Sequence, residues 1–161
     1  MDRCFRQGIY DTVAEVFETV FLIPLERMED GVIHRGIGET CAGYFEVRID
    51  LLNGCRSPAF FFFPAGLVKE IAGDFLGLDG EVMALAELTP VAKMAAKMTM
   101  GGLLARVDPR ALIRAGEPRS RSIENFVPRR LFETPGAWVY KTGRGYMWVD
   151  VGRIEDVAAH C

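Results

Sequence analysis

Residues 59–63, "AFFFF", are apolar at every position, and this run constrains the fold more than any other part of the sequence. A strand with one face in water alternates apolar and polar residues, whereas a strand covered on both faces does not. Four consecutive phenylalanines on an exposed strand would also favour aggregation. The sequence therefore predicts a central strand here, with other parts of the chain packed against both of its faces.

Hydrophobic spacing before this run predicts one helix and two strands. Apolar residues recur three and four apart over residues 9–23, which indicates a helix with one buried side that ends at Pro24. Residues 31–38 and 43–52 are typical of strands, and the second segment alternates apolar with charged side chains. The turn-rich residues 53–58 then lead into the central strand.

Two further helices are predicted after the central strand. Pro64 is a residue type favoured at a helix start, and Gly77 is one favoured at a helix end. Thr89 is a good N-cap residue, and with Pro90 at the first helical position it predicts a second helix that runs to about Arg106.

The remaining segments complete an α+β order of elements. Residues 108–130 are rich in arginine and show little periodicity. We therefore expect a connection whose charged side chains lie in water, on loops and at the edge of a strand. Residues 137–151 predict a hairpin with its turn at the sequence GRG. Short turns between sequential strands indicate antiparallel pairing. A helix followed by strands occurs twice in this order, which suggests an internal repeat.

Composition excludes several classes of protein. The chain has 161 residues and a net charge of -3, which does not suggest general nucleic-acid binding. No apolar run approaches the roughly 20 residues of a membrane span, and the N-terminal residues lack the apolar stretch of a signal peptide. We therefore expect a single cytoplasmic domain over residues 1–161, with its core over about 9–152.

Metal-binding residue types are few and scattered. No two of the cysteines and histidines have the close spacing that zinc sites use, so we expect free thiols and neither a metal nor a cofactor. The residues concerned are Cys4, Cys41, Cys55, Cys161, His34 and His160.

Three segments carry a resemblance to a known family. They read EVFETVFLIP (15–24), FFFFPAGLVKEIAGDFLGLDGE (60–81) and TPVAKMAAKMTMGGLLAR (89–106). Their order and spacing resemble those of the CheX/CheC/FliY chemotaxis phosphatases, above all the CheX branch. The resemblance implies a CheC-like fold, an antiparallel sheet with long helices packed on one face, and often a homodimer. It also implies a partner, the CheY-like receiver domain of a response regulator, from whose aspartate the family removes a phosphoryl group.

The catalytic motif of the resembled family is not matched. That family carries E-x-x-N on the helix that ends in glycine, where the glutamate pairs with a lysine of the regulator and the amide positions the attacking water. Here the two positions hold Met94 and Lys97, and E-x-x-N occurs nowhere in the chain. A lysine has donors but no acceptor, whereas an amide has both. We therefore expect a non-catalytic or divergent signalling relative that binds a receiver through Lys93, Met94, Lys97 and Gly101.

Other interpretations stay open at this point. An active phosphatase could use Lys97 as a phosphoryl clamp, with Glu15 or Glu18 as the acceptor. The arginine-rich stretch 106–130 could belong to an anion or small-ligand sensor. For the methionines of the 89–106 helix, the alternative to partner contact is packing in the core, which we expect for Met98.

Overall fold

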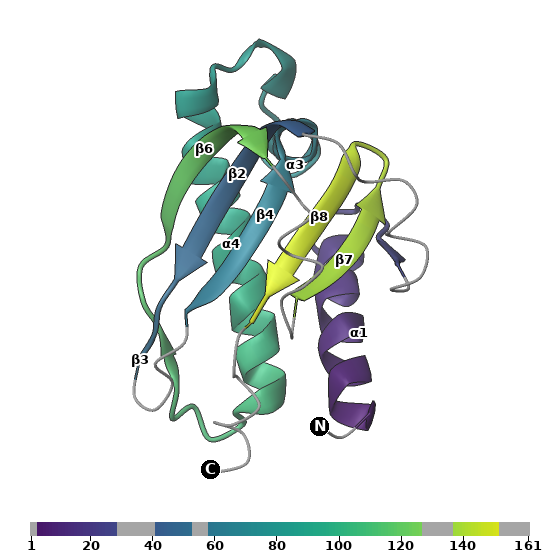
Figure 1. Ribbon diagram of the computed structural model, residues 1–161, viewed down its shortest axis with the longest axis vertical. Coiled ribbons are helices and arrows are strands. Elements are labelled where there is room, and N and C mark those ends of the chain that lie inside the picture. The colour runs from purple at the N-terminus through teal and green to yellow at the C-terminus, as the bar shows by residue number, and fades with distance from the viewer. Residues whose placement is uncertain (1–2, 29–40, 53–57, 127–136, 152–161) are drawn as a thin grey trace.

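An antiparallel sheet of six strands is the centre of the fold in the residues that the structure describes. The computed structural model describes residues 3–28, 41–52, 58–126 and 137–151 (Figure 1). The spatial order of the strands is β1-β7-β8-β4-β2-β6, and β3 and β5 form a separate pair. The strands are β1 (Glu26–Arg27), β2 (Cys41–Ile49), β3 (Leu51–Leu52), β4 (Ala59–Pro64), β5 (Arg114–Ala115), β6 (Arg119–Phe126), β7 (Ala137–Thr142) and β8 (Gly145–Asp150).

The central strand predicted from the phenylalanine run is confirmed. β4 pairs with β2 on one side and with β8 on the other. Phe61 and Phe63 are fully buried in the core that the helices share, whereas Phe62 belongs to a second buried cluster with Tyr44 and Trp148. Side chains on both faces of β4 are therefore packed, which explains why the strand has no polar positions.

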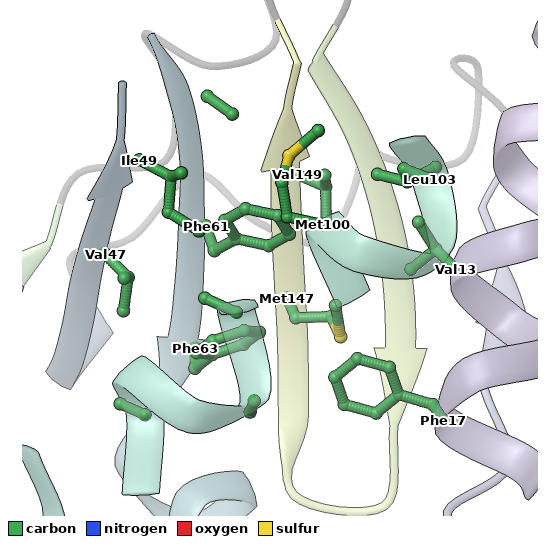
Figure 2. Packing of buried hydrophobic residues seen from close by; sticks show 14 of the residues in the cluster. Val13, Phe17, Val47, Ile49, Phe61, Phe63, Met100, Leu103, Met147 and Val149 are labelled. Atoms are coloured by element: carbon green, nitrogen blue, oxygen red, sulfur yellow. The ribbon is translucent and has the colours of Figure 1, made fainter. Parts of the chain in front are cut away.

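The α-helices α1 (Arg3–Thr19), α3 (Ala65–Asp74) and α4 (Leu85–Val107) pack on one face of the sheet (Figure 1). Figure 2 shows side chains of α1 and α4 facing those of the strands: Val13, Phe17, Met100 and Leu103 opposite Phe61, Phe63, Met147 and Val149. This arrangement confirms the predicted α+β class with helices on one face. No helix within the described ranges is long and apolar enough to cross a membrane.

The start of α4 differs from the prediction. Thr89 is expected as the N-cap, but α4 begins at Leu85 with Ala84 as its N-cap. The Glu87 carboxylate accepts a hydrogen bond of 2.9 Å from the Ala84 backbone N–H, which ties the first turn together. Pro90 consequently lies inside the helix, where its missing N–H removes one backbone hydrogen bond. The expectation was wrong because the hydrogen bond between Ala84 and Glu87, and not Thr89 with Pro90, forms the start of the helix.

The other two helices are confirmed, although both end earlier than predicted. α1 ends at Thr19 rather than at Pro24, and Leu22 in the following segment has a φ of 58°. α3 ends at Asp74, and Gly77 lies in the turn after it with a φ of 67°. That positive φ is one that glycine adopts without steric cost, which accounts for a glycine at this turn.

Part of the arginine-rich stretch forms a strand and not a connection. β6 is an edge strand that pairs with β2. A guanidinium nitrogen of Arg121 lies 2.9 Å from the Glu46 carboxylate, and one of Arg119 lies 2.7 Å from that of Asp50. The strand was missed because its alternating Arg and Ser residues give no apolar periodicity. The strand-edge charge expected for this stretch is confirmed.

The predicted C-terminal hairpin is also confirmed, as β7 and β8, and the hydroxyl of Thr142 donates to the carbonyl of Gly145 across its turn at 2.7 Å. The predicted strand over residues 31–38 lies outside the described residues. So do the side chains of all four cysteines and both histidines.

Substitution of Arg48 is expected to raise the pKa of Asp50. A hydrogen bond from Arg48 Nε to Asp50 Oδ1 at 3.0 Å, helped by the charges of Arg48 and Arg119, holds the pKa of Asp50 below its ordinary value. This stabilisation is therefore present above the ordinary pKa and is lost as the pH falls through the lowered one. Carboxyl NMR titration should show the Asp50 pKa returning toward its ordinary value in Arg48→Ala. An Asp50 that titrates at its ordinary value in the parent protein would contradict the prediction.

Candidate partner-binding face of helix α4

One side of α4 faces away from the core, and it holds the residues predicted from the sequence. Pro90, Lys97 and Gly101 are exposed, while Lys93 and Met94 are half-buried. Positions 90, 94, 97 and 101 have the spacing of a single helical stripe. The opposite side is the buried arc: Leu88, Val91, Ala92, Ala95, Ala96, Thr99, Met100, Leu103 and Val107. The structure therefore places Met94, Lys97 and Gly101 on the same outer surface, which we call the α4 outer face.

Lys97 has an ion-pair partner that the sequence did not suggest. Its ammonium nitrogen lies 3.6 Å from the carboxylate of Glu117, which stands between β5 and β6. The two side chains are 59% and 89% exposed. Exposed pairs of this kind contribute at most about 1 kcal/mol, because water screens them. The pair was missed because the two residues are distant in sequence and no local pattern joins them.

The methionines of α4 divide differently from the expectation. Met98 is expected on the buried side, but its side chain is 37% exposed, and Met100 is the fully buried one. Val91 lies at the edge of the buried arc, and Met98 follows it by seven residues. Seven residues advance about 20° less than two full turns, which moves Met98 past that edge. Met94 is packed in part against the core, so only part of its side chain is available to a partner.

The two glycines near the end of α4 have different surroundings. A Cβ at Gly102 would lie 2.9 Å from Cγ2 of Val16 and 3.7 Å from Cγ2 of Thr12, both on α1. Gly102 therefore lets α1 and α4 approach closely. A Cβ at Gly101 would meet no atom of the described residues within 4 Å. Gly101 thus has open space on the α4 outer face.

The two acids proposed as alternative acceptors lie on another helix. Glu15 and Glu18 are exposed on α1, and α1 packs on the side of α4 that carries Gly102. In the described part of the chain, the acid that reaches Lys97 is Glu117. Among the same residues, no three of His, Cys, Asp and Glu lie close enough together to hold a metal ion.

Comparison with known structures identifies the fold. CheX from Vibrio vulnificus superposes with a TM-score of 0.63 at 14% identity, over 90% of this chain and 93% of that one. FliY from Thermotoga maritima gives a TM-score of 0.59 at 12% identity, over 99% and 96%. CheX in the CheX–CheY–BeF3–Mg complex from Borrelia burgdorferi gives 0.56 at 7% identity, over 90% and 94%.

The chain has the fold of the CheX, CheC-like and FliY proteins. The predicted CheC-like fold is therefore confirmed. No protein-family model matches the chain, and no curated protein matches it by sequence. The likeness therefore lies in the arrangement of helices and strands, and the α4 outer face has to be interpreted from its own residues.

Valine substitutions at the two glycines are expected to have different effects on stability. Gly102→Val should lower the free energy of unfolding by about 1–3 kcal/mol, because the new side chain would collide with Val16. Gly101→Val should leave stability unchanged or raise it slightly, because valine is a better helix former than glycine. Urea unfolding of both variants measures the difference. Equal losses at the two positions would contradict the assignment of Gly101 to an open surface.

Proposed function

We propose that this protein is a divergent relative of the CheX-like chemotaxis proteins that binds the receiver domain of a response regulator. The proposed contact is the α4 outer face, with Lys93, Met94, Lys97 and Gly101. The shared fold supports the family, and the CheX–CheY complex of Borrelia burgdorferi supports the class of partner. The proposed role is to bind and regulate the receiver in chemotaxis or two-component signalling.

Gly101 is the observation that carries the proposal. Glycine inside a helix costs about 1 kcal/mol relative to alanine. At Gly102 the close contact of α1 with α4 offsets this cost. At position 101 no described neighbour requires a glycine. A position without a Cβ lets another molecule come close to the helix backbone. A docking surface therefore explains Gly101, whereas packing among the described residues does not.

The charge of the α4 outer face suits a phosphorylated aspartate. Lys93 and Lys97 are four residues apart and present two ammonium groups on one side of the helix. A phosphoryl group brings negative charge and strong acceptor oxygens, so it would attract both. Because the Lys97–Glu117 pair is exposed and weak, Lys97 can exchange Glu117 for the phosphoryl group at little cost. Met94 would add a flexible apolar contact beside these charges.

The residues of this face do not supply the chemistry of the resembled family. The attacking water needs an acceptor that orients it, and the family uses an amide at the position of Lys97. The Lys97 ammonium only donates hydrogen bonds, and Met94 offers no carboxylate. Loss of such positioning typically costs orders of magnitude in rate. We therefore propose that the protein binds the phosphorylated receiver without efficient hydrolysis.

An active phosphatase is the second candidate, and the Lys97–Glu117 pair is the observation that favours it. In that mechanism Lys97 would stabilise charge on the phosphoryl oxygens, and the Glu117 carboxylate would accept a hydrogen from the attacking water. This version needs Glu117 as the acceptor, in place of Glu15 or Glu18. The anion-sensor interpretation has less support, because Arg119 and Arg121 already have carboxylate partners on the sheet.

Lys97→Glu is expected to weaken binding of a beryllofluoride-activated receiver from the same genome. The substitution reverses a charge that faces the phosphoryl site, so we expect a loss of about tenfold, or about 1.4 kcal/mol. Gly101→Val should weaken binding in the same way by blocking close approach. Titration calorimetry measures both affinities. Lys141→Glu is the matched control, because Lys141 is an exposed lysine on β7 and not on α4.

The same proteins distinguish a binder from a phosphatase. Decay of the phosphorylated receiver should be unchanged or slowed when the parent protein is added. Acceleration that is lost in both Lys97→Ala and Glu117→Gln would establish the second candidate. No binding by the parent protein to any receiver of its genome, phosphorylated or not, would refute both.

We also propose a homodimer that forms along β6. β6 is an edge strand of the described sheet, and a strand edge presents backbone donors and acceptors that a second copy can pair. Sedimentation at micromolar concentration is expected to give twice the mass of one chain. A single-chain mass over the whole concentration range would contradict this part of the proposal.

A further inference from the structure

Exposed apolar side chains gather at the connection between α3 and α4. The described residues expose nine large apolar side chains, and five of them lie between residues 75 and 85. They are Phe75, Leu76, Leu78, Val82 and Leu85, with exposed fractions from 38% to 77%. We call this the 75–85 surface, and Figure 1 shows this connection at one end of the molecule, beyond the strands. Scattered single apolar residues are normal on a surface, whereas contiguous apolar patches mark interaction sites.

The 75–85 surface belongs to a fixed part of the fold. Gly80 packs on α3 so closely that a Cβ there would lie 2.3 Å from the Lys69 carbonyl oxygen. The short 3-10 helix η1 (Gly80–Val82) follows, and backbone hydrogen bonds from Val82 to Asp79 and from Met83 to Gly80 hold its turn. These contacts fix the backbone so that the apolar side chains stay in water. Their exposure is therefore part of the architecture and does not reflect a loose segment.

The segment that follows α1 contacts this surface through Phe21. The ring of Phe75 packs edge-on against buried Phe21 with centroids 5.3 Å apart, and Leu22 follows Phe21 in the chain. Leu22 is 72% exposed and has a φ of 58°, which is an uncommon conformation for a residue other than glycine. Such a conformation costs of order 1–3 kcal/mol and tends to occur at functional sites. The strained backbone keeps one more apolar side chain in water, one residue after the contact of Phe21 with Phe75.

Acidic side chains outnumber basic ones around the surface. Asp74, Asp79, Glu81 and Glu87 are exposed, and residues 70–92 contain no lysine, arginine or histidine. Two cations lie nearby: a guanidinium nitrogen of Arg144 is 3.1 Å from the Glu81 carboxylate, and Lys69 belongs to the turn of α3 on which Gly80 packs. An apolar centre with an acidic rim attracts a segment that has an apolar stripe and basic flanks.

We propose that the 75–85 surface binds a basic amphipathic helix of a partner protein. The apolar stripe of that helix would cover Phe75, Leu78 and Val82, and its lysine or arginine side chains would meet Asp74 and Asp79. This contact is separate from the α4 outer face, whose lysines suit an acidic partner. The protein would therefore join two partners of opposite charge through the two regions, and the second contact does not depend on the first.

Binding of designed peptides tests the proposal. The probes are two fluorescent 18-residue amphipathic helices with the same leucine stripe, one with lysine and one with glutamate on its polar side. Anisotropy should show the lysine peptide binding at least tenfold more tightly, with an affinity that falls as salt is added. The double variant Leu78→Ser/Val82→Ser should lose at least tenfold in affinity for it. Its control is Leu52→Ser/Leu112→Ser, which removes two exposed leucines, at 49% and 48%, outside the 75–85 surface.

Charge reversal and sedimentation complete the test. Asp74→Lys should weaken binding of the lysine peptide, whereas Glu124→Lys on β6 should not. Equal binding of the two peptides, or unchanged binding by Leu78→Ser/Val82→Ser, would overturn the proposal. A change in oligomeric mass in that double variant alone would show that a second copy covers the surface, and this would also overturn it. None of these outcomes involves a receiver, so they are independent of the proposed function.

Discussion

The burial of β4 on both faces is the constraint on which the rest of the structure depends. A strand of phenylalanines needs a strand on each edge and packed side chains above and below, and β2, β8, the helices and the aromatic cluster of Tyr44 and Trp148 supply them. α1 and α4 must then share one face of the sheet. Each of these helices keeps one side free, and for α4 that free side is the candidate binding face.

The contact of α1 with α4 determines which residues that side presents. Gly102 allows Val16 and Thr12 to approach the backbone of α4, which fixes the rotation of α4 about its axis. With the helix held in this way, Met100 points into the core and Gly101 points outward. The two adjacent glycines therefore have separate explanations. Gly102 is required by packing within the chain, whereas nothing among the described residues requires a glycine at position 101.

The sequence predicted the parts of the fold that depend on local periodicity. The central strand, the three helices and the C-terminal hairpin all follow from patterns within about twenty residues. Helix boundaries were less accurate: the hydrogen bond between Ala84 and Glu87 decides where α4 begins, and apolar spacing carries no sign of it. β6 was missed because an edge strand with polar residues on both faces has no apolar pattern. Glu117 was missed because its pairing with Lys97 arises only from tertiary packing.

Under the proposed function, Met94 and Lys97 at the positions where the resembled family has an acid and an amide would change the partner that the α4 outer face can accept. In the resembled family, the glutamate pairs with a lysine of the regulator. Here that lysine would meet Lys93 and Lys97 with no carboxylate from position 94, and like charges at close range oppose binding. A phosphoryl group between the lysines would offset this repulsion, so binding should depend strongly on phosphorylation of the receiver. A receiver without the lysine would bind in both states. If the α4 outer face binds a receiver as proposed, its charge would select among receivers, even where the fold is shared.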